Sequence, residues 1–248
     1  MTALPLGRGR RGATLASAIC ALVVTGTALT GCSEDPDAGT NGVGKLTPEQ
    51  IQKKTRTVAV AADAVRLSGA VVVKGRTYRL DMQLKGNGGA GSVTAEGATF
   101  RLLRVDEHLF LKADASFWSH EDNSESDAAA AGKLGGKYVK VPMGDPAYQR
   151  LSGFTDKGVL LDGLLSLHGD LATDGRREQN GIRTIRLTGD KGSGGTLDIS
   201  LDGSPYPVRL VRAGGAGTLR LTDWGRNFTL AEPPEEETVD YGKQLPAS

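Results

Sequence analysis

The 248-residue sequence predicts an α+β fold, in which a large curved antiparallel β-sheet of about ten strands has two or three helices over its apolar concave face. Two long blocks of the chain place apolar residues at every second position between Gly- and Asp-rich turns, which is typical of an antiparallel sheet with one wet face. Two further segments have apolar residues at helical spacing. No period of about 20 to 50 residues recurs, so a solenoid or a propeller is not expected.

The composition is that of a folded protein with many turns. Hydrophobic residues make up 38% of the chain and charged residues 24%, which excludes a disordered chain, a coiled coil or a multi-span membrane protein. The 35 glycines fall between short apolar runs and have no G-x-y period, so they indicate turns rather than a collagen-like repeat. Because 30 basic residues are balanced by 29 acidic ones, nucleic acid is not an expected partner.

Residues 1–31 are predicted to be a lipoprotein signal peptide. Three arginines and no acid stand near the start, and residues 13–30 form an uncharged apolar run. The run ends in Leu29-Thr30-Gly31-Cys32, which resembles the lipobox of bacterial lipoproteins, where the cysteine thiol receives a diacylglyceryl group and the chain is cut just before it. The alternative is an ordinary signal peptide followed by an incidental cysteine. Arg10-Arg11 leaves the twin-arginine export route open beside the general one.

Cys32 is therefore the expected anchor of a protein attached to the cell membrane on its extracytoplasmic face. Cys20 leaves with the leader, so the mature chain keeps no thiol for a disulfide, a zinc site or a nucleophile. Residues 32–46, polar and rich in Gly and Asp, are predicted to be the lipidated cysteine and a flexible tether. Cleavage leaves 27 basic and 29 acidic residues, so we expect mild repulsion from an anionic bilayer.

Residues 47–242 are predicted to form the folded domain, and residues 243–248 a short C-terminal tail. Thr47-Pro48-Glu49-Gln50 combines a capping Thr, a Pro at the first helical position and a Gln three residues after the Thr, so a helix is expected from here to about Arg66. After it the apolar period changes from 3.6 to 2, which predicts a meander of short strands as far as Lys112.

The centre of the chain has a different pattern. Residues 115–136 join the pair Phe117-Trp118 to an acidic, Ala-rich stretch, which predicts a short helix and then a mobile loop. A strand at 138–141 precedes the most apolar part of the mature chain, residues 146–167, where we expect one or two helices broken near Gly158. Five further strands are expected between residues 171 and 224.

Several short motifs of this chain occur together in a known family. They are His108-Leu109-Phe110-Leu111-Lys112, Phe117-Trp118, Lys137-Tyr138-Val139-Lys140-Val141-Pro142, and Leu221-Thr222-Asp223-Trp224-Gly225 followed by Pro233-Pro234. With the lipobox and the leading helix, the chain resembles the actinobacterial lipoproteins related to mycobacterial LprG and LppX, which share the LolA/LolB-like half-barrel. The resemblance implies a hydrophobic cavity between sheet and helices that holds the acyl chains of lipids or glycolipids, and transport of these lipids across the envelope. The Ala- and acid-rich insertion at 122–131 departs from the family pattern.

The alternation of the strands selects the residues expected to face the helices. Those we expect to line the cavity are Val58, Ala62, Tyr78, Leu80, Met82, Leu109, Leu160, Leu164, Leu197, Ile199, Val208 and Leu210. Phe117 and Trp118 are expected at its lip. The same apolar residues are equally suited to a closed core, so the residues alone do not require a cavity.

No arrangement of residues predicts catalysis. The histidines at 108, 120 and 168 are isolated, and no zinc-protease, nucleophile-elbow or phosphate-loop motif occurs. His120-Glu121-Asp122 as a metal site and Asp223 as a glycosidase acid are weaker interpretations than solvated carboxylates. We therefore expect no enzyme, no cofactor and no metal.

Three functions are compatible with the sequence. The first is a lipid-binding lipoprotein that carries a lipid or glycolipid and meets a membrane transporter or another envelope protein. The second is a surface lipoprotein of the same fold that binds a protein or senses envelope stress without lipid transport. The third is an enzyme.

Overall fold

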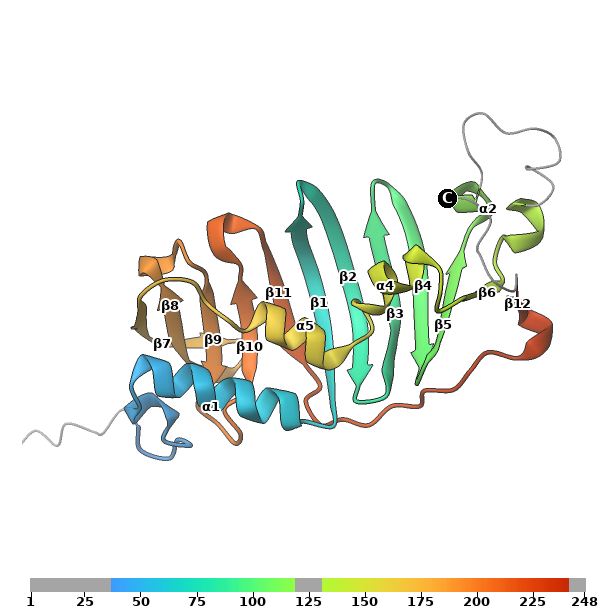
Figure 1. Ribbon diagram of the computed structural model, residues 1–248. Helices are drawn as coiled ribbons and strands as arrows, with labels where there is room; N and C mark the ends of the chain where they lie inside the picture. Colours follow the sequence, from blue (N-terminus) through green and yellow to red (C-terminus); the bar gives the residue numbers. More distant parts are fainter. Residues whose placement is uncertain (1–36, 119–130, 241–248) are drawn as a thin grey trace, which may run out of the picture. The chain divides into compact units, whose positions relative to one another are not determined.

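The computed structural model describes residues 37–118 and 131–240. Pro36–Ser248 forms one compact unit with its own apolar core. Its centre is a twelve-stranded sheet with the order β12-β6-β5-β4-β3-β2-β1-β11-β10-β9-β8-β7 (Figure 1). All neighbouring strands are antiparallel except β12 and β6, which are parallel. The predicted α+β fold with a large antiparallel sheet is confirmed.

The strand bounds are β1 (Ala64–Val73), β2 (Arg76–Lys85), β3 (Gly88–Ala95), β4 (Ala98–Val105), β5 (His108–Ala113), β6 (Tyr138–Val141), β7 (Leu171–Gln179), β8 (Ile182–Gly189), β9 (Thr196–Ser200), β10 (Pro207–Val211), β11 (Gly217–Thr222) and β12 (Thr238–Asp240). The α-helices are α1 (Pro48–Ala61), α2 (Ala115–Trp118), α4 (Pro146–Ser152) and α5 (Lys157–Leu164), and residues 131–134 are also helical. Short 3-10 turns are η1 (Val43–Lys45), η2 (Asp190–Gly192), η3 (Ala213–Gly215) and η4 (Glu235–Glu237).

Helix α1 begins as predicted but ends earlier. The Thr47 side chain accepts a hydrogen bond from the Gln50 backbone, and the Gln50 side chain accepts one from the Thr47 backbone, which completes the capping box. The expected continuation to Arg66 is wrong, because Ala64 already pairs with β2 and Arg66 pairs with both β2 and β11. Pairing on two sides outweighs the helical pattern at these residues.

The predicted break in the second helical segment is also displaced. It lies at residues 153–156 between α4 and α5, whereas Gly158 is inside the first turn of α5. Asp156 determines the position, since its side chain accepts a hydrogen bond from the Val159 backbone and caps α5.

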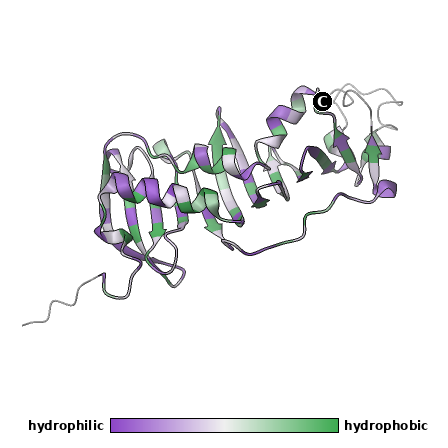
Figure 2. Cartoon of the chain, turned by 60° about the horizontal axis from the view of Figure 1, so that its bottom comes forward, coloured by the Kyte–Doolittle hydropathy of each residue, from purple (hydrophilic) through white to green (hydrophobic). Residues whose placement is uncertain are grey.

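One face of the sheet carries the core. Leu67 lies opposite Met82 and Leu221 in register, and residues of this parity are apolar across most strands. Helices α1 and α5 pack on each other and lie over this face, with apolar side chains toward it (Figures 1 and 2). The opposite face of the sheet is polar.

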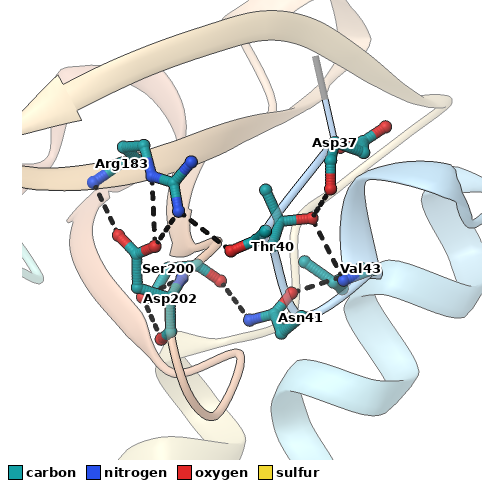
Figure 3. Close-up of polar contacts among 9 residues, drawn as sticks. Asp37, Thr40, Asn41, Val43, Arg183, Ser200 and Asp202 are labelled. Atoms are coloured by element: carbon teal, nitrogen blue, oxygen red, sulfur yellow. Dashed lines mark hydrogen bonds and ion pairs between the residues drawn. The ribbon is translucent and has the colours of Figure 1, made fainter. Parts of the chain in front are cut away.

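Part of the expected tether belongs to the domain. Val43 is fully buried, and Asn41 donates from Nδ2 to the Ser200 carbonyl at 2.9 Å (Figure 3). Asp37 forms an ion pair with Arg176 at 2.6 Å. The prediction of a flexible tether is therefore wrong for residues 37–46, because one apolar side chain and several backbone hydrogen bonds fix them to the edge of β9. Residues 32–36 lie outside the described part of the chain.

The chain after β11 follows one edge of the sheet to reach β12 (Figure 1). Trp224 stacks on Tyr206 with ring centroids 4.7 Å apart and donates from Nε1 to the Pro207 carbonyl at 3.0 Å. Further along, His108 Nδ1 and Glu232 Oε1 are 2.5 Å apart. These contacts bring β12 beside β6 at the far end of the sheet.

Candidate functional site

The candidate site is the apolar face of the sheet and the segments that cover it. Its central row runs in register through Leu187, Leu197, Leu210, Leu219, Gly69, Leu80, Val93, Phe100 and Ala113. The row therefore crosses nine strands from β8 to β5. Gly69 has φ 139°, and a Cβ there would lie 2.2 Å from the Thr218 carbonyl oxygen, so only glycine allows β1 and β11 to approach in this way.

Most of the predicted lining residues lie on this face or against it. Buried in the core cluster are Leu80, Met82, Leu109, Leu164, Leu197, Ile199 and Leu210. Tyr78 and Leu160 are partly buried and pack against that cluster. Ala62 is buried just after α1, and Val58 is half-buried on α1, whose buried residues are Ile51, Thr55 and Ala59. Val208 differs from the others, because a register shift between Pro207 and Arg209 interrupts the alternation there.

A polar clasp joins the two helices over one half of the face. The Lys157 ammonium donates to the Val60 carbonyl at 2.9 Å and to the Ala62 carbonyl, both at the C-terminal end of α1. This is a favourable position for a cation, because the last carbonyls of a helix have no intrahelical partner. Burial lowers the pKa of Lys157 below its ordinary value. Arg56 and Asp162 add an exposed ion pair at 2.9 Å between the same helices.

A different set of contacts covers the other half of the face, over β2 to β5. Arg104 points inward from β4, and its guanidinium donates to the side chain and the carbonyl of Thr155, both at 3.1 Å. Tyr78 and Phe154 have ring centroids 5.7 Å apart. The Tyr148 hydroxyl donates to the Glu107 carbonyl at 2.7 Å. The segment from α4 to α5 is thus attached to the sheet by aromatic rings and one arginine.

The aromatic pair predicted at the lip lies at this end of the face. Phe117 contacts Phe100 with ring centroids 5.4 Å apart, and Phe117 and Trp118 meet edge to face at 5.1 Å. Trp118 is buried, and its Nε1 is among the buried polar atoms without a hydrogen-bond partner in the part of the chain that the structure describes. Residues 119–130, which hold most of the expected mobile loop, lie outside that part. The role as a lip stays a prediction.

Two pockets lie beside the helical cover. The smaller, about 60 Å³, brings together the predicted residues Leu164 and Leu210 with Leu167 and His168. A single water needs about 30 Å³, so this pocket is too small for an acyl chain. A larger surface pocket of about 660 Å³ lies along α1 and α5, where Lys53, Arg56 and Asp162 give it a charged lining.

The described residues show neither a metal cluster nor a spanning helix. Within 37–118 and 131–240, no three side chains of the kinds His, Cys, Asp and Glu are placed to hold one metal ion. No helix in the same ranges combines the length and the apolarity needed to cross a bilayer. The residues 120–122, considered above as metal ligands, lie outside these ranges.

Comparison with solved structures identifies the fold. The structure of LprF from Mycobacterium bovis aligns with a TM-score of 0.53 and 16% sequence identity, over 76% of this chain and 99% of that one. The lipoprotein LppX from Mycobacterium tuberculosis aligns with a TM-score of 0.42 and 19% identity, over 73% of this chain and 97% of that one. No protein-family model matches the sequence, and no curated protein matches it. The predicted likeness to the LprG- and LppX-like lipoproteins is therefore confirmed for the fold.

Proposed function

We propose that this protein is a lipoprotein, anchored through Cys32 on the extracytoplasmic face of the membrane, which binds the acyl chains of a lipid or glycolipid between its sheet and its helices and carries that lipid through the envelope. The observation that supports the proposal most is the continuous apolar row across nine strands, covered by helical segments that come from two separate parts of the chain. Acyl chains need a site of this extent without buried charge.

The cover determines how such a ligand would enter. Leu80, Leu197 and Ile199 are almost fully buried, so acyl chains fit on this face only if part of the cover moves. The segment from α4 to α5 is the part we expect to move, because it is attached to β2 to β5 through half-buried side chains such as Leu151 and Phe154. Lifting it would expose Tyr78, Leu80 and Met82 on β2.

The experiment measures lipid bound to the 36–248 unit purified from a bacterial host. We expect organic extracts of the wild-type unit to contain acyl lipids, detected by mass spectrometry. Leu80→Trp should reduce the bound lipid several-fold, because the indole would occupy the space of an acyl chain. Thr77→Trp is the matched control, since Thr77 is on the same strand with opposite parity and is exposed; its lipid content should equal that of the wild type.

A second function has one observation in its favour. The predicted lining residues on the strands are packed as a core, with Met82, Leu109, Leu197 and Ile199 fully buried. A surface lipoprotein that binds a protein or senses envelope stress needs no cavity. Wild-type protein free of lipid, together with a large loss of stability in Leu80→Trp from overpacking, would favour this function over lipid binding.

A further inference from the structure

The polar face of the sheet, opposite the proposed lipid site, carries a row of charged side chains. In register from β8 to β5, the row contains Arg186, Asp198, Arg209, Arg220, Ser68, Asp81, Ser92, Arg101 and Lys112. It therefore holds five cations and two carboxylates, although the mature chain as a whole has slightly more acids than bases. Ionic screening acts within about 8 Å at physiological salt, so a ligand at this face meets the local excess of cations rather than the net charge.

Two pairs in this row place like charges directly opposite each other. Arg209 faces Arg220 between β10 and β11, and Arg101 faces Lys112 between β4 and β5. Such cross-strand pairs are unfavourable unless another charge compensates them. Asp198 lies 3.7 Å from Arg209, and Glu237 lies 3.7 Å from Lys112, so one member of each pair has an acidic partner. Within the described residues, Arg101 and Arg220 have no ion pair with an acid.

A hollow of about 420 Å³ lies beside Arg101 on this face. It is lined by Arg66, Asp81, Gln83, Ala90, Gly91, Ser92, Thr99 and Arg101. Its floor is formed by the small residues of β3, and taller side chains from β1, β2 and β4 stand around it. The volume is within the range of small-molecule sites in proteins.

The charges around the hollow are not balanced. Arg66 binds Asp81 through two hydrogen bonds, at 2.9 and 2.8 Å, so these two side chains neutralise each other. Arg101, exposed on the opposite wall, leaves the hollow with one net positive charge. Thr94 and Thr99 share a hydrogen bond of 2.8 Å at one end, and the Ser92 and Gln83 side chains offer further polar groups.

We propose that this hollow binds a phosphate ester attached to a hydroxyl-bearing group, such as the headgroup of an anionic phospholipid or a free polyol phosphate. Arg101 supplies the charge and a planar set of donors, which suits phosphate oxygens. The Ser92 and Thr99 hydroxyls lie on the floor and wall to donate to the same group, while Gln83 and Asp81 can bond the hydroxyls of the polyol. This site goes beyond the proposed acyl-chain site and does not depend on it, because the two lie on opposite faces of the sheet.

The first test is calorimetric titration of the 36–248 unit with glycerol phosphate, with glycerol as the neutral comparison. We expect saturable binding of glycerol phosphate and none of glycerol. Arg101→Gln should weaken this binding at least tenfold. Arg150→Gln is the matched control, because Arg150 is exposed on α4 away from the hollow; its affinity should stay within twofold of the wild type.

A second variant separates a built site from a merely basic surface. Ser92→Val keeps every charge but fills the floor of the hollow, and valine is well suited to a strand. We expect it to weaken binding as strongly as Arg101→Gln. Thr99→Val, which removes only an exposed hydroxyl, serves if Ser92→Val does not fold, and should weaken binding several-fold. Full binding by Ser92→Val and Thr99→Val, with loss in both Arg101→Gln and Arg220→Gln, would overturn the site in favour of a diffuse basic surface.

Sedimentation with vesicles identifies the source of the phosphate. Binding to vesicles of phosphatidylcholine with phosphatidylglycerol, competed by glycerol phosphate, would assign the site to a lipid headgroup. Binding of glycerol phosphate without vesicle binding would assign it to a free phosphorylated compound. Absence of binding to glycerol phosphate and to the vesicles, or equal binding by wild type and Arg101→Gln, would overturn the proposal.

Discussion

The two halves of the apolar face differ in how they are covered. Over β7 to β9, α1 and α5 bury Ile51, Leu161 and Leu164, and Lys157 joins the ends of the two helices. Over β2 to β5, the cover consists of α4 and the segment after it, whose apolar residues are only half-buried. One sheet thus carries a closed core at one end and a more weakly attached cover at the other, and we infer that a ligand enters at the second.

The largest expected effect compares two leucines of the cover. Leu161→Ala on α5 should lower the free energy of unfolding by about 2 to 5 kcal/mol, because Leu161 is fully buried and its removal leaves a cavity. Leu151→Ala on α4 should cost about 1 kcal/mol, because Leu151 is partly exposed already. Urea denaturation of both variants measures the difference, and equal losses would contradict the contrast between the halves.

The next effect concerns the clasp. Lys157→Met should cost about 1 to 3 kcal/mol, because the Val60 and Ala62 carbonyls lose their buried donor. Lys133→Met, at an exposed lysine, should cost less than about 0.5 kcal/mol. Similar unfolding free energies for the two variants would show that the clasp contributes nothing.

Lys157 also predicts a pH dependence. Burial lowers its pKa in the folded protein below the ordinary value of 10.5, so the unfolded chain binds more protons between the two values. Stability due to this lysine should therefore rise with pH through that window up to about 10.5. Denaturation curves of wild type and Lys157→Met, taken at several alkaline pH values, should diverge in favour of the wild type, and convergence would contradict the shift.

A smaller effect is expected at Arg104. Arg104→Met should cost about 1 to 2 kcal/mol, because two hydrogen bonds to Thr155 are lost while the methionine still fills the space. Hydrogen exchange should quicken in residues 146–156 and remain unchanged in α1. Arg101→Met, on the same strand but the opposite face, should leave exchange in the cover as it is in the wild type.

The two tryptophans give the smallest effect and the sharpest pair. Trp118→Phe should change the free energy of unfolding by less than about 0.5 kcal/mol, because its Nε1 makes no hydrogen bond in the described structure and the ring contacts are kept. Trp224→Phe should cost about 1 kcal/mol, because its Nε1 bond to the Pro207 carbonyl is lost. Thermal unfolding of both variants checks the order, and a larger loss in Trp118→Phe would reverse it.

The sequence patterns predicted the sheet well because alternation and turn residues are local signals. The cap at Thr47 and the parity of Tyr78, Leu80 and Met82 belong to this class, and so does Arg104, whose parity with Phe100 already indicated the inner face. Other features depend on contacts between distant segments. The docking of Asn41 on Ser200, the bulge at Val208 and the parallel pairing of β12 with β6 leave no periodic signal. The hollow beside Arg101 also emerges only from the register of four strands.

Photo-crosslinking with a fatty acid that carries a diazirine on its acyl chain tests the central claim most directly. After irradiation of the 36–248 unit, tandem mass spectrometry locates the labelled residues along β2. Binding on the apolar face predicts label on Tyr78, Leu80 and Met82, and on the facing segment 151–164. Label confined to Thr77, Arg79 and Asp81 on the polar face of the same strand, or no label above that of an unreactive fatty acid, would contradict the account.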